Sequence, residues 1–514
     1  MRALVLFTLG IAWLTVTSCV IQRGSVVPIG PAVQDTTIVL SPLKAFMRDG
    51  SIVVYSDGAL VTNVAVQGSG TRYSLGLVDS VSVSEIALDS VIGIEAFQHD
   101  VNVGGSVLAS AFGGGAAVFG TGLLLKALFG SCPTIYVETA QGQELQAEAF
   151  SYSIAPLLEA RDLDRLDLTP DRDGMIGLEL RNEALETHYI NHLELLAVRH
   201  DEGIYVVPDE RGQPVGVRRM RPPARAVDRG GRPVLQELHG ADGVSFESTD
   251  GRIAAASSTD WRDHVELTFP APFEGDSVVA VFELRNSLLN TVLFYDLMLA
   301  SSGARALDWL GRSMERIDTA VELGRWFHET MGLTVEVFDG SGWLPVGRIG
   351  DTGPIAWKSV GVRVPVLQED SLRIRLSFLA DEWRIDRVAV GELRSVEART
   401  RLPVVGMTDL TGRSLGQHMA SIELPDDEYM TTHPGTAARL EFRGLPPQEG
   451  QAVTYFLSTQ GYYTEWVRPE WIRAGSGSPR FKPGDGTIEE LMARWSEEKD
   501  RYERTFFETR IPVR

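Results

Sequence analysis

The chain has 514 residues, enough for several domains, and its acidic composition excludes some classes of partner. It carries 69 acidic against 48 basic residues, a formal net charge of −21, which argues against nucleic acid because phosphate binding requires a basic surface. Apolar residues make up 44% and charged residues 23%, as in folded globular chains. The two cysteines, Cys19 and Cys132, exclude a framework of disulfides.

The first 18 residues are predicted to be a secretory signal peptide. Arg2 supplies a short positive region, and an apolar run of the expected length follows over residues 3–14. The run ends in VTSC at residues 16–19, which resembles the lipobox of bacterial lipoproteins. The alternative is an ordinary signal peptide that is cleaved nearby, with Cys19 incidental.

The lipobox resemblance implies that Cys19 becomes the mature N-terminus, with diacylglycerol on its sulfur and a further acyl chain such as palmitate on its amine. Several acyl chains make a stable membrane anchor. The next residue is Val20 and not Asp, which in such lipoproteins implies the outer membrane if the cell is Gram-negative. Residues 19–35 are predicted to be a tether rich in Gly, Pro and Val.

Residues 36–98 are predicted to form a small β-barrel. Short runs of β-forming residues alternate with turn signals such as RDG at 48–50 and SDG at 56–58. About five short strands in this length suit an SH3-like or Sm-like barrel. The DGS and DGA turns resemble those of such barrels in bacterial envelope proteins, but the fold alone assigns no function.

Residues 101–130 form a Gly-rich apolar run in which Lys126 is the only charge. A helix of about 25 residues would cross a hydrocarbon core of about 30 Å, and small residues four apart favour close contacts between helices. The triple glycine at 113–115 weakens a continuous helix, and a span would divide the chain between two compartments. Two interpretations therefore stay open: a membrane-inserted helix over 101–129, or a helical hairpin packed on the globular part.

The rest of the chain is predicted to be mainly β and divided into several domains. Strand-like runs are separated by Gly, Pro and Asp, which favours β-sandwiches. Apolar residues at helical spacing predict a helical insertion, and a charged helix with Leu491 and Trp495 facing inward is expected near the C-terminus. The predicted domains are β-sandwich-like units over 131–284 and 332–397, the helical insertion over 285–331, a β-rich segment over 398–475 and a tail over 476–514.

Three short motifs resemble segments of large uncharacterised bacterial envelope proteins. They are SCPTIY at 131–136, RNE with a following ET within 181–187, and GYYTEW at 461–466. In those proteins an SCP segment opens a β domain, and a GYY-x-EW segment lies near the C-terminus. The resemblance implies no activity, because none is assigned to the group.

Two groups of residues are candidates for binding a ligand. An arginine-rich run over 211–232 could hold an anionic glycan or a lipid headgroup, although such runs are commonly solvated loops. Aromatic residues of the C-terminal motif could stack on sugars, although aromatic residues in strands usually pack in a core. The candidate binding residues are Arg218, Arg219, Arg221, Arg225, Tyr462, Tyr463 and Trp466.

The patterns that suggest a metal site fail on their spacing. His188, His192 and His200 lie in a strand-like run, where positions four apart are about 13 Å apart, too far for one ion. An Asp-rich stretch around Asp171 and Asp173 does not align with an EF-hand loop and is predicted to be a turn. We therefore predict no metal and no cofactor.

One catalytic pattern fails on its context. Residues 412–416 read GRSLG, a match to G-x-S-x-G centred on Ser414, with His418 close by. The nucleophile elbow requires a strand, a helix and a parallel α/β sheet, whereas this part of the chain is predicted to be β. No catalytic residue is assigned.

The sequence therefore favours a non-catalytic binding or scaffolding protein that is anchored by lipid in the bacterial cell envelope. Its expected partners are the membrane, through Cys19 and the 101–129 segment, and an anionic glycan or another envelope protein. The alternative is an envelope hydrolase that uses Ser414 with His418, or a histidine-bound metal.

The lipid anchor is tested by Cys19→Ala in the full chain. Because the acyl chains would be attached at this residue, we expect the parent to sediment with membranes after cell breakage and the variant to stay in the soluble fraction. Immunoblotting of both fractions measures the outcome. A variant that still sediments through its N-terminal segment would contradict the lipobox interpretation.

Overall fold

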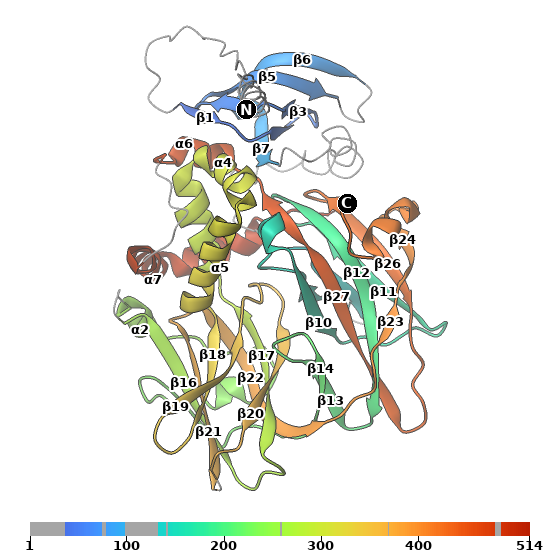
Figure 1. Cartoon of the computed structure of the whole chain (residues 1–514), viewed down its shortest axis with the longest axis vertical. Helices are drawn as coiled ribbons and strands as arrows, with labels where there is room; N and C mark the ends of the chain where they lie inside the picture. Colours follow the sequence, from blue (N-terminus) through green and yellow to red (C-terminus); the bar gives the residue numbers. More distant parts are fainter. Residues whose placement is uncertain are drawn as a thin grey trace, which may run out of the picture. The chain divides into compact units, whose positions relative to one another are not determined.

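The computed structural model is mainly β, as predicted, and its described strands form five sheets of antiparallel strands (Figure 1). The predicted signal peptide at 1–18, Cys19 with its tether, and the apolar run at 101–130 lie outside the described residues. None of the helices described is long and apolar enough to cross a membrane. The structure describes residues 36–74, 79–97, 132–139, 142–256, 260–368, 370–477 and 485–513.

The first sheet is a bent half-barrel of seven strands, where the sequence predicted about five. Residues 61 and 65 belong to two different strands separated by a turn, in which the hydroxyl of Thr62 accepts the N–H groups of Val64 and Ala65. The strand order is β1-β4-β5-β3-β2-β7, and β6 pairs with β5. The strands are β1 (Thr37–Val39), β2 (Leu43–Met47), β3 (Ile52–Tyr55), β4 (Ala59–Val61), β5 (Ala65–Tyr73), β6 (Ser80–Ala87) and β7 (Val91–Ala96).

Two further sheets make the first β-sandwich, in the orders β10-β27-β12-β23, with β25 on β12, and β24-β26-β11-β8-β9. Leu178, Leu193, Leu440 and Leu457 belong to the apolar core that the two sheets share. The strands are β8 (Thr134–Thr139), β9 (Gly142–Glu148), β10 (Ala160–Leu166), β11 (Met175–Arg181), β12 (Glu186–Asp201), β23 (Thr400–Leu402), β24 (Val404–Thr408), β25 (Met430–Thr432), β26 (Ala437–Arg443) and β27 (Gln451–Glu465).

The last two sheets make the second β-sandwich, in the orders β13-β14-β22-β17-β20 and β15-β16-β21-β18-β19. In β16, Val265, Leu267 and Phe269 are buried and alternate with more exposed residues, as expected for a strand with one face on a core. The strands are β13 (Ile204–Pro208), β14 (Pro214–Arg221), β15 (Arg225–Asp228), β16 (Arg262–Pro270), β17 (Ser277–Asn286), β18 (Leu333–Phe338), β19 (Trp343–Ile349), β20 (Lys358–Pro365), β21 (Ser371–Leu379) and β22 (Trp383–Arg394).

Sheet membership differs from the predicted domain boundaries. The predicted unit over 131–284 supplies strands to both sandwiches, and the segment over 398–475 returns to complete the first one. The second sandwich, over 204–394, is therefore an insertion between two halves of the first. Turn residues mark where strands end, but hydrogen bonds between distant segments decide which strands pair, so local patterns placed the boundaries differently.

The helical insertion predicted over 285–331 is confirmed, and it shares one apolar core with the half-barrel and the C-terminal helix. Leu491 and Trp495 are fully buried in that core, as predicted. The helices are α2 (Asp250–Ala254), α3 (Leu289–Thr291), the π-helix η7 (Val292–Ala300), α4 (Arg305–Gly311), α5 (Ile317–Thr330), α6 (Pro469–Ala474) and α7 (Asp485–Glu508). The short 3-10 helices are η2 (Leu88–Ser90), η5 (Pro156–Leu158), η6 (Gln236–Leu238), η8 (Ser313–Glu315), η9 (Gly416–His418) and η10 (Ala420–Ile422).

The half-barrel is attached to the first sandwich at the end of β27. Trp466 stacks on Phe46 of the half-barrel, with ring centroids 3.8 Å apart and an angle of 9° between the planes. The backbones of Ile94 and Val467 exchange two hydrogen bonds of 3.0 and 2.9 Å. A side chain at Gly93 would place its Cβ 2.9 Å from Trp466, so this close approach requires glycine.

Trp466→Ala is expected to lower the free energy of unfolding by about 3–5 kcal/mol, because it removes a fully buried ring and leaves a cavity at this contact. Urea unfolding followed by circular dichroism measures the change. Trp343→Ala, at a partly exposed position on β19, is the matched control and should lower the free energy of unfolding clearly less. Equal losses in the two variants would show that the contact with Phe46 contributes little.

Candidate binding cavity

The aromatic residues proposed to stack on sugars are buried, which corrects that prediction. Tyr462, Tyr463 and Trp466 are 9%, 5% and 2% exposed. Tyr462 stacks on Tyr189 across the β12–β27 ladder with ring centroids 4.6 Å apart, and the indole of Trp466 donates a hydrogen bond to Thr187. Trp466 packs against the half-barrel, and of the three rings only Tyr463 reaches the cavity described below.

The GYYTEW motif pairs with the segment that begins β12. Glu186 lies directly opposite Glu465 in the ladder, and both are fully buried. Burial raises the pKa of each carboxyl to about 8, although the charge of Arg468 opposes the shift. Arg468 donates a hydrogen bond of 2.7 Å to Glu465. The two acids and the arginine therefore form a buried polar cluster.

The SCPTIY motif lies in the neighbouring sheet and meets the residues of the RNE segment. Thr134 and Tyr136 both donate hydrogen bonds of 2.9 Å to the carboxylate of Glu183. Arg510, near the C-terminus, donates to the other oxygen of Glu183 at 2.6 Å. This motif therefore joins the C-terminal tail to the sandwich, and its contacts are structural.

The three histidines considered as metal ligands have separate partners. The Nε2 of His188 lies 2.7 Å from Glu186, and burial lowers the pKa of His188 to about 3. His192 lies 3.3 Å from Glu194, and His200 bonds a threonine hydroxyl. Across the described ranges, no group of three His, Cys, Asp or Glu side chains is arranged to hold a metal ion.

The G-x-S-x-G pattern forms a loop and not a nucleophile elbow. Ser414 is exposed after β24, and its Oγ accepts a hydrogen bond of 3.2 Å from the N–H of Gly416. His418 lies in the short helix η9, and no hydrogen bond joins it to Ser414 in the described chain. The adjoining sheet is antiparallel, whereas the elbow requires a parallel one. Asp171 likewise closes an ordinary turn by accepting two N–H groups of its own loop.

The candidate arginines are divided between two sheets. Arg218, Arg219 and Arg221 belong to β14, and Arg225 belongs to β15 of the facing sheet. Arg219 pairs with two carboxylates at 2.8 and 3.1 Å, and Arg221 lies over an aromatic ring. Arg218 and Arg225 are exposed and have no ion pair among the described residues. The structure therefore does not gather the four into one cationic site.

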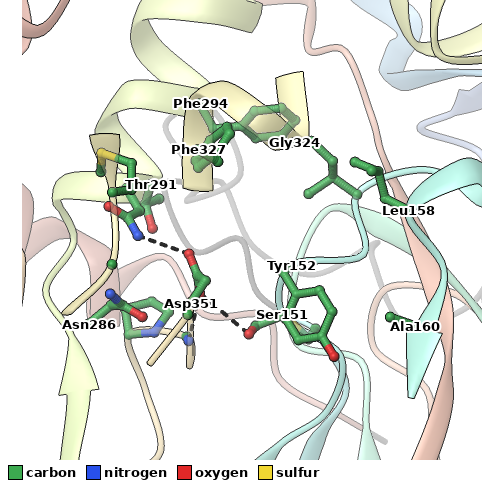
Figure 2. Close-up of a pocket in the computed structure, with 18 of the residues that line it drawn as sticks. Ser151, Tyr152, Leu158, Ala160, Asn286, Thr291, Phe294, Gly324, Phe327 and Asp351 are labelled. Atoms are coloured by element: carbon green, nitrogen blue, oxygen red, sulfur yellow. Dashed lines mark hydrogen bonds between the residues drawn. The ribbon is translucent and has the colours of Figure 1, made fainter. Parts of the chain in front are cut away.

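A cavity of about 330 Å³ lies where the two sandwiches meet the helical insertion (Figure 2). The helices η7 and α5 contribute an apolar wall that includes Phe294, Leu323 and Phe327. The segment after β9 contributes Tyr152 and, further along, Leu158. Such a concave, mostly apolar space with a few polar groups is typical of a site for a small molecule.

Glu148, at the end of β9, is one of the polar groups of the cavity and also joins the two sandwiches. It is 2% exposed, and its Oε2 accepts hydrogen bonds from the backbone of Ile355 and Ala356, at 2.9 and 3.3 Å. Burial raises the pKa of Glu148 to about 8. A Cβ on Gly353 would lie 2.4 Å from the Glu148 carboxyl, so the loop can approach only with glycine there.

Glu382 lies in the turn before β22 and is 1% exposed. Its two oxygens accept the backbone N–H groups of Gly332, at 2.6 Å, and Leu379, at 3.3 Å. Burial, and to a smaller extent the charge of Asp351, raise the pKa of Glu382 to about 7, and the charge of Arg262 opposes the shift. This carboxyl therefore ties the end of the helical insertion to the second sandwich while lining the cavity.

Asp351 projects between the helices and the first sandwich (Figure 2). Its Oδ2 accepts a hydrogen bond of 2.9 Å from the amide of Asn290, and its Oδ1 accepts from Ser151 at 3.4 Å and from Gly353 at 2.9 Å. Among the described residues, the buried Oδ1 of Asn290 has no hydrogen-bond partner, and the same is true of the buried Nδ2 of Asn286. One acceptor and one donor of the cavity lining are therefore not used by the described part of the chain.

The sequence interpretation missed this cavity. Glu148, Asp351 and Glu382 come from three distant segments of the chain, one from a strand and two from connecting loops. Glu148 lies in the sequence AEAF, and its two alanine neighbours face the other side of the strand, so the local pattern gives no sign that Glu148 is buried. Only the fold shows that the three acids line one space.

No family model and no curated protein matches the chain. Among solved structures, an allantoicase aligns over 51% of this chain and 90% of its own, at 11% identity and a TM-score of 0.19. A GH31 alpha-xylosidase from Xanthomonas citri aligns over 83% and 38%, at 10% identity and a TM-score of 0.16. An exo-beta-1,3-galactanase from Phanerochaete chrysosporium aligns over 69% of each chain, at 11% identity and a TM-score of 0.16. Scores this low support no inference about function. The fold and the cavity together place the chain in a broad class, that of multidomain β proteins with a cavity between their domains.

Glu148→Gln tests the protonation of the buried acid. Between its ordinary pKa of 4.5 and its folded pKa of about 8, the folded chain holds a proton that the unfolded chain has released. The contribution of this group to the free energy of unfolding is therefore complete below pH 4.5. It declines by on the order of 1 kcal/mol per pH unit as the pH rises to about 8. Because Gln does not titrate, the variant should lose stability less steeply. Urea unfolding at pH 5, 6, 7 and 8 measures the slope.

Glu144→Gln, at an exposed position on the same strand, is the matched control and should leave the slope as in the parent. A slope in Glu148→Gln equal to that of the parent would contradict the raised pKa.

Proposed function

We propose that the protein is a lipid-anchored protein of the bacterial cell envelope with a non-catalytic binding role, and that its ligand occupies the cavity between the sandwiches and the helices. The cavity carries this proposal, because its volume of about 330 Å³, its apolar wall and its few converging polar groups are those of a small-molecule site. The VTSC sequence ending at Cys19 supports the anchor. Membrane contact is made through Cys19 and, in one of the two interpretations, through residues 101–129.

Scaffolding of other envelope components is part of the same proposal. The half-barrel and the second sandwich leave large surfaces exposed, and the exposed Arg218 and Arg225 stay candidates for contact with an anionic glycan. The ligand of the cavity and a partner on the surface would be bound independently, since the arginines do not line the cavity.

A catalytic use is less well supported. Acids with a raised pKa also occur in active sites. In this cavity, however, Glu148 and Glu382 each accept two backbone N–H groups, so their oxygens hold loops in place. Ser414 and His418, the hydrolase pair considered from the sequence, do not bond each other in the part of the chain that is described.

Gly324→Trp tests whether a ligand enters the cavity. Gly324 lies on α5 at the rim of the cavity (Figure 2), and a Cβ there would meet no atom within 4 Å. The indole should fill the mouth without strain, and replacing a helical glycine stabilises a helix. We expect the parent to bind the neutral probe N-phenyl-1-naphthylamine with one-to-one stoichiometry, and the variant to bind at least tenfold more weakly by fluorescence titration.

Gly251→Trp is the matched control, because Gly251 is also a helical glycine with no atom within 4 Å of its Cβ, but lies in α2 and does not line the cavity. It should bind the probe as the parent does. Equal binding by parent and Gly324→Trp would show that the cavity is not the binding site.

A further inference from the structure

Among the described residues, the three acids of the cavity form no ion pair, whereas several buried acids elsewhere in the protein do. Lys358 lies 2.5 Å from Asp162 and 3.0 Å from Asp164, and Arg384 lies 2.8 Å from Asp381. Buried ionisable groups are normally paired in this way. Buried Asp263 and Asp386 also form no ion pair in the described chain and accept only neutral donors, but they do not line the cavity. The cavity acids differ because they border a space that a ligand can enter.

No Lys, Arg or His forms an ion pair with Glu148, Asp351 or Glu382 in the described ranges. Arg348 also lines the cavity, but its guanidinium donates to Thr334 and to the backbone carbonyl of Met331 and not to an acid. Arg285 and Arg262, which act on Glu148 and Glu382 through charge, bond backbone carbonyls instead. The nearby guanidinium groups therefore donate hydrogen bonds mainly to backbone carbonyl groups, and the three acids line one cavity without an ion pair among the described residues.

We infer that the ligand of this cavity is an organic ammonium ion, a small molecule with an apolar body and a protonated amino group that lies against Asp351. The inference rests on the proposed binding function and specifies its ligand class. An ammonium group has three donors and no acceptor, so it can donate to a carboxylate and to a neutral acceptor at once. Asp351 supplies the charge, and the buried Oδ1 of Asn290 supplies an acceptor that bonds no atom of the described residues.

Aromatic side chains of the cavity suit the same ligand. Tyr152, Phe294 and Phe327 line the space into which Asp351 projects (Figure 2). Aromatic faces attract organic cations, and the attraction increases when water is excluded. An apolar body would occupy the wall formed by Leu158 and Leu323. One end of the cavity thus binds charge and the other binds hydrocarbon.

A bound metal ion would also be a cation, but the geometry does not fit one. A divalent ion needs several oxygen ligands at about 2.0–2.6 Å. In the described chain, no three acidic, histidine or cysteine side chains converge closely enough to provide them. An amino group, which can be held by one carboxylate and a neutral acceptor, matches the spacing of these residues.

The test compares three eight-carbon ligands with different head groups: 1-octylamine, 1-octanol and octanoate. Each competes with N-phenyl-1-naphthylamine for the full chain at pH 8, at concentrations below those at which it aggregates or separates from solution. We expect the amine to displace the probe at a concentration at least tenfold lower than the alcohol, and octanoate to be the weakest. The preference should be lost in Asp351→Asn, where amine and alcohol should differ less than threefold.

Asp351→Asn is expected to fold, because the amide of Asn290 can turn its unpartnered Oδ1 toward the new N–H group. Asp339→Asn is the matched control. Asp339 also accepts loop N–H groups, but it is exposed in the β18–β19 turn and does not line the cavity. This variant should keep the preference for the amine. Circular dichroism and the unfolding midpoint show whether each variant is folded.

The outcomes separate the two proposals. If displacement by all three ligands is unchanged in Gly324→Trp, the cavity does not bind small molecules and the proposed function fails. If Gly324→Trp abolishes displacement but octanol or octanoate matches octylamine, the cavity binds and the inference of an ammonium ligand is wrong. An amine preference that persists in Asp351→Asn would likewise overturn the role of Asp351.

Discussion

The antiparallel ladder between β12 and β27 holds the rest of the structure in place. It pairs residues 186–201 with residues 451–465, which are far apart in the chain and belong to two of the motifs seen in the sequence. At one end the chain leaves β12 for the second sandwich, so the ladder closes the two halves of the first sandwich around that insertion. β12 and β27 lie side by side in the first sandwich (Figure 1). At the other end of the ladder, Trp466 and Val467 contact the half-barrel and Tyr463 reaches the cavity.

Polar contacts between the two sandwiches explain why a cavity persists at their junction. Lys358 on β20 binds Asp162 and Asp164 on β10, and Glu148 on β9 accepts N–H groups from the loop before β20. These directional contacts set the spacing of the sandwiches, whereas an apolar interface could close by repacking side chains. The helices then cover one side with Phe294 and Phe327, which leaves a space that is apolar on the helix side and acidic on the sandwich side.

The local elements were predictable because their signals are local. The alternation of Val265, Leu267 and Phe269 marks a strand, and the helical spacing of Leu491 and Trp495 marks a buried face, and both are confirmed. The burial of the aromatic residues of GYYTEW could not be predicted from the sequence, because the local pattern of a strand is the same whether a ring faces solvent or a neighbouring domain. Phe46, on which Trp466 stacks, lies more than 400 residues away in the chain.

The sequence by itself determined the mainly β class, the helical insertion, the acidic charge and the absence of a disulfide framework. It also carries the lipobox resemblance on which the proposed anchor rests. Tertiary structure decided which strands share a sheet, where the aromatic residues are buried, and that Glu148, Asp351 and Glu382 line one cavity. The division follows from physics: periodicity and turn chemistry act over a few residues, whereas sheet pairing, desolvation and charge depend on neighbours that only the folded chain brings together.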